Sequence, residues 1–423
     1  MKKIFFVFII SLTHVYLFSS IIIIEVSQPI HPVSSEYICN SIAKADKEKA
    51  ELLIIKLDTP GGLDISMREI IQKILNSETP VAVWVCPPGA RAGSAGFFIT
   101  LASDIAIMSS GTSIGAAHPV SATGEKIDPV MSDKITNDAI SYAKSLASKR
   151  GRNIKMSEEA VKTSQSYTEE EALKGGLIDF IANSPDEIKD KLHNKKIKKF
   201  SGKEVLLRIK NAEKKEVPMS ARQKILSIIS NPNLAYILLI LGMLGIYFEL
   251  SNPGAIFPGV LGGICLLLAF FSFQILPINY VGLLLILLSL GLFIAEVKIQ
   301  SYGVLGIGGV IAMIFGSLML FNAPIPEMKP ELSLIFPVAI GISLIFIFLL
   351  YLAIKTHRKK VFTGEQGMVG EIGEALTDIG ESGKTFIHGE IWDACSYQKI
   401  LKGSKIIVKK INGLKLVVEK FEE

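Results

Sequence analysis

A serine set among small residues is the first feature of the chain that could do chemistry. Ser94 lies within residues 90–96, where glycine and alanine flank it and would let a substrate backbone approach closely. An apolar helix is expected to begin at about this serine. The free N–H groups at its start, with that of Ala95 first, would then suit a developing oxyanion. A serine that only caps a helix fits the same pattern, so both interpretations stay open on this stretch alone.

A serine nucleophile needs a base within hydrogen-bond reach and a second oxyanion donor. His118 and Lys134 are the two candidate bases downstream. A lysine can act as a base only if burial lowers its pKa from about 10.4. A solvated lysine at a helix start and a structural histidine at a strand end are the alternatives. The backbone of Gly61 or Gly62, in a glycine turn, would supply the second donor.

The elements around these residues predict an α/β layer with a parallel sheet. Apolar runs typical of buried strands alternate with amphipathic helical patterns. Strands are expected at 21–26, 51–57 and 81–85, and helices at 34–50 and 66–76. Further on, a strand-to-loop segment at 113–119, a polar loop at 121–133, a helix at 134–149 and a helix–strand unit at 167–179 are expected.

Composition places the chain in a membrane. It has 423 residues, 49% of them hydrophobic, and a mean hydropathy of +0.42. The formal net charge is only +5, and aromatic residues do not interleave with the basic runs, so nucleic acid is not expected as a partner. The four cysteines are widely spaced and form no cluster with histidines. They therefore predict neither a disulfide framework nor a zinc site. No other metal and no cofactor is expected.

The first twenty residues predict export. Two lysines precede an apolar run that ends near residue 18, which is the pattern of a signal peptide or an uncleaved N-terminal anchor. Either would place the following domain, expected at 21–205, outside the cytoplasm. A lysine-rich, polar stretch then predicts a linker at 206–232.

A membrane block follows at 233–355, with about five helices. The apolar segments 233–250, 255–275, 277–297, 303–322 and 333–354 have the length of membrane spans. Five spans that start outside end inside, and the basic segment 355–360 agrees with the positive-inside rule. We therefore predict an integral, multi-pass membrane protein with its C-terminus in the cytoplasm.

The tail, residues 360–423, predicts a small β-barrel of the OB type. Short strands are expected at 371–378, 384–392, 405–410 and 415–420, separated by glycine turns. Such a fold does not by itself identify a ligand.

Three motifs of the chain together resemble a known family. Residues 57–62, 87–96 and 111–116 are similar to the NfeD family of membrane proteases, which have a ClpP/crotonase-like fold. Residues 168–179 resemble a helix–turn–strand unit of signal peptide peptidase A. The order of export signal, protease domain, membrane block and OB-like tail is that of the long NfeD form, so the resemblance covers nearly the whole chain.

The resemblance implies a Ser–Lys dyad. The nucleophile of that family maps onto Ser94 and its lysine onto Lys134. His118 is a departure, because it falls close to where the related ClpP peptidases carry the histidine of their triad. We favour Lys134 as the base, since the rest of the chain resembles the dyad branch, and keep His118 as the alternative.

The resemblance also implies a function. We expect a membrane-anchored serine endopeptidase that cleaves apolar segments of stomatin-like membrane proteins, in a homodimer or higher oligomer. A non-catalytic scaffold for stomatin or flotillin relatives is the alternative from another class. A crotonase-type acyl-CoA enzyme is a third, which export from the cytoplasm disfavours.

Overall fold

The computed structural model describes residues 20–121, 128–251, 254, 256–276, 278–299, 301, 303–322, 329–357 and 365–421. The expected signal or anchor lies outside these residues except for Ser20. The described residues fall into two compact units: residues 1–295 with 307–341, and residues 296–306 with 342–423.

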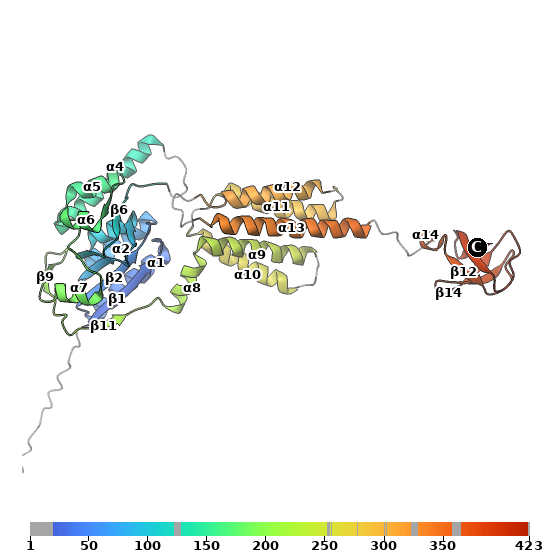
Figure 1. Ribbon diagram of the computed structural model, residues 1–423, viewed down its shortest axis with the longest axis horizontal. Coiled ribbons are helices and arrows are strands. Elements are labelled where there is room, and N and C mark those ends of the chain that lie inside the picture. The colour runs from blue at the N-terminus through green and yellow to red at the C-terminus, as the bar shows by residue number, and fades with distance from the viewer. Residues whose placement is uncertain are drawn as a thin grey trace, which may run out of the picture. The chain divides into compact units, whose positions relative to one another are not determined.

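The N-terminal domain is built on a parallel sheet of six strands in the order β11-β1-β2-β3-β5-β8. Figure 1 labels β1, β2 and β11 of this sheet. Its strands are β1 (Ser20–Ser27), β2 (Leu52–Asp58), β3 (Val81–Val85), β5 (Ile105–Met108), β8 (Phe180–Ile181) and β11 (Glu213–Glu216). Successive residues of β1 pack into different hydrophobic clusters, with Ile22 and Ile24 on one face and Ile21 and Ile23 on the other. Both faces are therefore buried, as continuous apolar strands require.

A second sheet of three short strands, in the order β4-β6-β7, lies beside the start of a buried helix. Its strands are β4 (Arg91–Gly93), β6 (Ser113–Gly115) and β7 (Ser166–Thr168). The helices of the domain are α1 (Pro32–Glu48), α2 (Asp64–Asn76), α3 (Ala95–Ala102), α4 (Pro129–Arg150), α5 (Ile154–Lys162), α6 (Glu169–Lys174) and α7 (Pro185–Leu192). All eight residues of α3 are buried. The expected α/β fold is confirmed.

The polar stretch expected to be a linker is instead folded. It contains the edge strand β11 and α8 (Ala221–Ile229), and a two-stranded sheet of β9 (Lys196–Lys198) and β10 (Glu204–Leu206) lies just before it and at its start. β11 pairs with β1 in parallel, and the Tyr37 hydroxyl donates to the carbonyl of Val217. The sheet therefore continues past the expected boundary at residue 205. The sequence hid this because all four residues of β11 are charged and exposed.

Apolar helices occupy the region where five spans were expected. They are α9 (Pro232–Ser251), α10 (Ile256–Phe273), α11 (Tyr280–Lys298), α12 (Val304–Met319) and α13 (Leu332–His357). Among the described residues, two of them, at 232–250 and 256–273, are long and apolar enough by composition to cross a membrane. The apolar stretches of the other three are shorter, at 280–296, 304–319 and 332–345. Glycines let α9 and α10 approach closely, since a Cβ on Gly245 would lie 2.7 Å from the Cα of Gly262.

The C-terminal domain is a closed barrel in the order β12-β13-β14-β16-β15, with a short helix, α14 (Glu365–Met368), before it. Its strands are β12 (Ile372–Ala375), β13 (Gly383–Ile387), β14 (Glu390–Cys395), β15 (Lys405–Asn412) and β16 (Lys415–Lys420). The expected OB-like barrel is confirmed. The single strand expected at 384–392 is two strands, because His388 and Gly389 both adopt a positive φ and form a hairpin turn between them.

Candidate active site

Ser94 sits at a strained turn between β4 and α3. Its φ of 47° and ψ of −110° are unusual for a residue with a side chain, and its N–H donates to the carbonyl of Gly115 at 3.0 Å. It occupies the N-cap position of α3, yet its hydroxyl makes no capping bond. The side chain of Ser94 therefore does not cap α3. A sharp strand-to-helix turn that presents a serine hydroxyl is also the local geometry of a nucleophile elbow.

Gly61 packs directly against Ser94. A Cβ on Gly61 would lie 2.6 Å from the Cβ and 3.2 Å from the Oγ of Ser94, and the φ of +130° also excludes most side chains. The turn itself is clamped by Ile30, whose N–H donates to the Gly61 carbonyl at 2.7 Å and whose carbonyl accepts from the Leu63 N–H at 2.8 Å. The sequence from Asp58 to Gly62 is thus a rigid wall beside the serine.

The expected oxyanion donors differ in availability. Ala95 is the first residue of α3, so its N–H has no partner within the helix. The N–H of Gly61 donates to the Thr59 hydroxyl at 3.2 Å. Gly62 and Ala95 line the cavity in front of Ser94, whereas Gly61 is not among its lining residues. This geometry favours Gly62 over Gly61 as the partner of Ala95.

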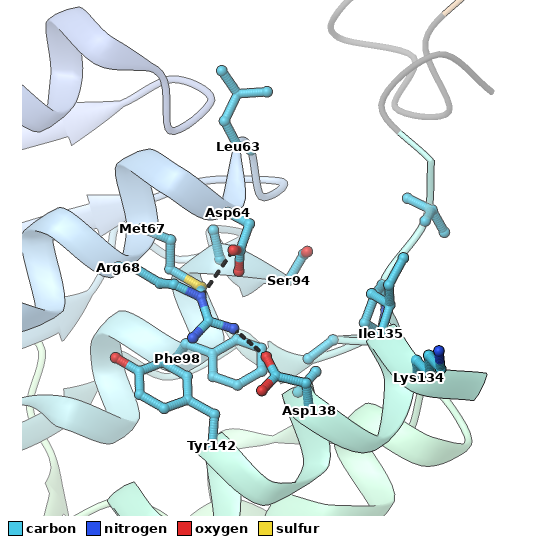
Figure 2. A pocket seen from close by; sticks show the side chains of 16 residues that line it. Leu63, Asp64, Met67, Arg68, Ser94, Phe98, Lys134, Ile135, Asp138 and Tyr142 are labelled. Carbon is cyan, nitrogen blue, oxygen red and sulfur yellow. Dashed lines mark hydrogen bonds and ion pairs between the residues drawn. The ribbon is translucent and has the colours of Figure 1, made fainter. Parts of the chain in front are cut away.

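A cavity of about 570 Å³ opens in front of Ser94 (Figure 2). Its apolar lining comes from α2, α3, α4 and the loops before them: Leu63, Met67, Phe98, Val120, Ile135 and Tyr142. Lys134 lines the same cavity from α4. In the described part of the chain, no group of three or more His, Cys, Asp or Glu side chains could hold a metal ion.

Lys134 does not lie at the start of its helix as expected. Asp128 caps α4 by accepting the N–H groups of Val130 and Met131, and Pro129 takes the first helical position. The helix therefore begins five residues earlier, and Lys134 lies in its second turn. The side chain is exposed, and among the described residues no hydrogen bond joins it to Ser94. Residues 122–127 of the expected loop lie outside the described residues.

His118 is directed elsewhere. Its Nδ1 lies 3.0 Å from the carbonyl of Val161, and because a carbonyl only accepts, this nitrogen carries the proton. His118 does not line the cavity, although its neighbours Ala117 and Pro119 do. Asp58 accepts the N–H of Arg91 at 3.0 Å, a turn-shaping contact.

The sequence reasoning missed a charged group on the cavity wall. Arg68 on α2 donates to Asp64 at 2.8 Å and to Asp138 at 2.6 Å, and its guanidinium lies 4.7 Å from the ring centre of Tyr142. The four-residue spacing from Asp64 to Arg68 was a readable helical pair. The partner on α4 was not, because it lies 70 residues away.

Comparison with known families identifies all three parts of the chain. Residues 20–217 match the NfeD1b N-terminal domain, residues 233–352 the NfeD integral membrane domain, and residues 365–420 the NfeD-like C-terminal, partner-binding domain. The first match ends at the edge strand β11 rather than at residue 205.

Two curated proteins are similar over most of their length. Membrane-bound protease PH1510 of Pyrococcus horikoshii is 37% identical over 389 residues, which cover 89% of this chain and 88% of that protein. Membrane protein NfeD1b of Bacillus subtilis is 26% identical over 418 residues, covering 94% and 92%.

Solved structures match individual domains. The 1510-N membrane protease specific for a stomatin homolog from Pyrococcus horikoshii is 35% identical, with a TM-score of 0.45 over 50% of this chain and 99% of that one. The C-terminal domain of stomatin operon partner protein 1510-C from the same organism is 35% identical, with a TM-score of 0.14 over 14% of this chain and 98% of that one. From the full-length relative and the three domain matches together, we conclude that the chain is a membrane protein and belongs to the NfeD family.

Proposed function

We propose that this protein is a membrane-anchored serine endopeptidase in which Ser94 is the nucleophile and Lys134 the base. One observation carries the proposal. The Ser94 hydroxyl at the start of α3 makes no capping hydrogen bond, and Ser94 lines a largely apolar cavity that Lys134 also lines. The similarity to a membrane-bound protease along 88% of that protein supports it.

The chemistry is acyl transfer. The neutral amine of Lys134 takes the proton of the Ser94 hydroxyl as the Oγ attacks the carbonyl carbon of the scissile peptide. The N–H groups of Ala95 and Gly62 bind the oxyanion. The lysine then gives its proton to the leaving amine, and a water molecule, activated by the same lysine, hydrolyses the acyl-enzyme. No metal or cofactor takes part.

The cavity favours an apolar substrate. Lys134 is exposed in the isolated chain, and a base of this kind must lose its water to work at neutral pH. A peptide with apolar side chains that fills the space among Phe98, Ile135 and Tyr142 would exclude that water. The proposed substrates are apolar segments of stomatin-like membrane proteins, a class taken from the family and from the specificity for which the relative 1510-N is named.

The test is peptide cleavage by the full chain in detergent micelles or lipid nanodiscs. A library of apolar peptides is offered to the wild-type chain and to Ser94→Ala, Lys134→Ala and His118→Ala. The first two variants should be inactive, and His118→Ala should keep most activity. Cleavage by Lys134→Ala but not by His118→Ala would transfer the role of base to His118.

Two measurements distinguish a catalytically inactive site from a misfolded domain. A fluorophosphonate should label Ser94 in the wild-type chain and in the His118→Ala variant but not in Gly61→Ala, whose new Cβ would lie 2.6 Å from that of Ser94. Near-ultraviolet circular dichroism checks the fold of each variant. If the folded wild-type chain takes no label at Ser94, the protease proposal is wrong and a non-catalytic scaffold is the better explanation. The match to a partner-binding domain favours that alternative.

The orientation in the membrane is part of the proposal. The protease domain is placed outside the cytoplasm and the barrel inside. Reporter fusions at residues 210 and 365 should therefore report opposite sides. Two fusions on the same side would require an even number of spans.

A further inference from the structure

The half of α4 that carries Lys134 is weakly held. The buried residues of α4 begin at Ala139, so every residue from Pro129 to Asp138 is at least partly exposed. Met131 and Ile135 on this half are 54% and 39% exposed. Apolar packing therefore does not fix where Lys134 stands relative to Ser94, although a displacement of about 1 Å can lower the rate of a positioned reaction a hundredfold.

The side chain of Arg68 connects α2 to this half of α4 through ion pairs. The Nη2 of Arg68 lies 2.6 Å from Asp138 on α4, while its Nε lies 2.8 Å from Asp64 on its own helix (Figure 2). Among the described residues 129–138, Asp138 is the one whose side chain bonds to another element. It lies four positions after Lys134, so the two side chains share a face of α4.

The guanidinium is itself fixed from the other side. It lies 4.7 Å from the ring centre of Tyr142, and that ring stacks on Phe98 of α3 with centroids 6.0 Å apart. Burial acts to lower the pKa of Arg68, but the hydrogen bonds that it donates to Asp138 and Asp64 outweigh this effect and raise the pKa overall. Arg68 therefore stays positively charged. In the described part of the chain, the titratable groups that act on Arg68 are Asp64 of α2 and Asp138 and Tyr142 of α4.

We infer that Arg68 is a positioning residue that pins the Lys134-bearing turns of α4 against the wall of the Ser94 cavity. The inference rests on the proposed function, because it assigns a purpose to the placement of Lys134. Asp64 follows Gly62 by two residues, and Asp138 follows Lys134 by four, so a single guanidinium connects the oxyanion loop to the helix of the base.

The ion pair between Arg68 and Asp138 also determines which cation the Asp138 carboxylate binds. With Arg68 in place, the Asp138 carboxylate is occupied by the guanidinium. Without Arg68, the same carboxylate is free to pair with Lys134 one turn away, which would hold that amine in its charged form. Asp133, the other acid beside Lys134, is unchanged by the loss. Removing Arg68 should therefore move the activity to higher pH as well as lower it.

The pair contributes little to overall stability. The side chains of Arg68 and Asp138 are 40% and 66% exposed, and ion pairs of that exposure stabilise a fold only slightly. Variants should therefore fold. A matched control exists on the same helix: Lys144 of α4 pairs with Glu158 of α5 at 3.1 Å, away from the cavity.

The experiment compares Arg68→Gln, Asp138→Asn, their double variant and the control Glu158→Gln in the full chain in nanodiscs. We expect kcat on a cleaved apolar peptide to fall about tenfold to a hundredfold in the first three with little change in KM, and to stay unchanged in the control. The half-maximal pH should rise in Arg68→Gln and return to the wild-type value in the double variant, which lacks the released carboxylate. A wild-type kcat in Asp138→Asn, or a change in KM alone, would overturn the inference.

A second readout does not depend on catalysis. Amide hydrogen exchange is measured on the same variants carrying Ser94→Ala. Peptides from residues 130–138 should exchange faster in Arg68→Gln and Asp138→Asn but not in Glu158→Gln. Unchanged exchange rates in all three variants would refute the inference that Arg68 holds this part of α4 in place. If Lys134→Ala cleaved peptides normally, the proposed base would be wrong, and exchange would still decide whether Arg68 holds α4.

Discussion

Acid should destabilise the N-terminal domain through one buried histidine. His31 caps α1, its Nδ1 accepting the N–H of Val33 at 3.2 Å, and the side chain is almost wholly buried. An Nδ1 that accepts a hydrogen bond cannot carry a proton. Burial lowers the pKa of His31 from 6.5 to about 4. The perturbation we propose is His31→Asn, which keeps a good cap and removes the titrating group.

The sign and size follow from this pKa. Between pH 6.5 and about 4, the unfolded chain binds a proton at His31 and the folded chain does not, so stability falls as the pH falls through this window. At 1.36 kcal/mol per pKa unit, the loss reaches about 3 kcal/mol, an order-of-magnitude figure. For a domain of this size the loss corresponds to roughly 5–10 °C in Tm.

The assay is thermal unfolding of the full chain in micelles at pH 7.0 and pH 4.2. Substituting Trp392→Phe leaves Trp84, which is buried in β3, as the single tryptophan and reports on this domain alone. Carboxyl groups also titrate in this range, so the decisive quantity is the difference between wild type and His31→Asn. The wild type should lose roughly 5–10 °C more than the variant. Equal losses would refute the reasoning, because they would mean that His31 titrates alike in the folded and unfolded chain.

Three further predictions concern the same domain. Asp104→Asn should lower the free energy of unfolding by about 3–5 kcal/mol in denaturant titrations, because it leaves the buried cations Arg150 and Lys199 without their shared anion; a loss below about 1 kcal/mol would contradict this. Cys86 should resist iodoacetamide at pH 8 in the native state and react only after denaturation, since burial raises the pKa of its thiol to about 12; rapid native alkylation would show that the site opens. A soluble fragment ending at residue 205 should elute as an aggregate in size-exclusion chromatography, because it lacks β11 and exposes the edge of β1. A fragment ending at residue 217 should stay monodisperse or form a defined oligomer. Equal behaviour of the two fragments would mean that β11 is dispensable.

The sequence predicted best where one face or both faces of an element are apolar. The run from Val81 to Val85 is a strand from its first residue to its last, and the apolar helices lie close to their expected bounds. Elements held in place by polar contacts were not predicted from the sequence. β11 consists of charged residues that any loop could contain, and its place in the sheet comes from the backbone ladder with β1.

The same division applies to the candidate site. Small residues around Ser94 and the glycine turn predicted a close approach, and the contact of Gly61 with the serine is the reason they are needed. The start of α4 was missed although Asp128 and Pro129 are readable cap signals. The bridge from Arg68 to Asp138 could not be read at all, because it joins helices that only the fold brings together.

The parallel pairing of β1 with β11 has a mechanical consequence. β11 leads by way of α8 toward the apolar helices, and its ladder runs in register with β1 from Ser20 with Glu213 to Ile23 with Glu216. Because β11 is the strand of the sheet nearest in sequence to the helical block, a pull from that block would load this ladder before the strands that position Ser94.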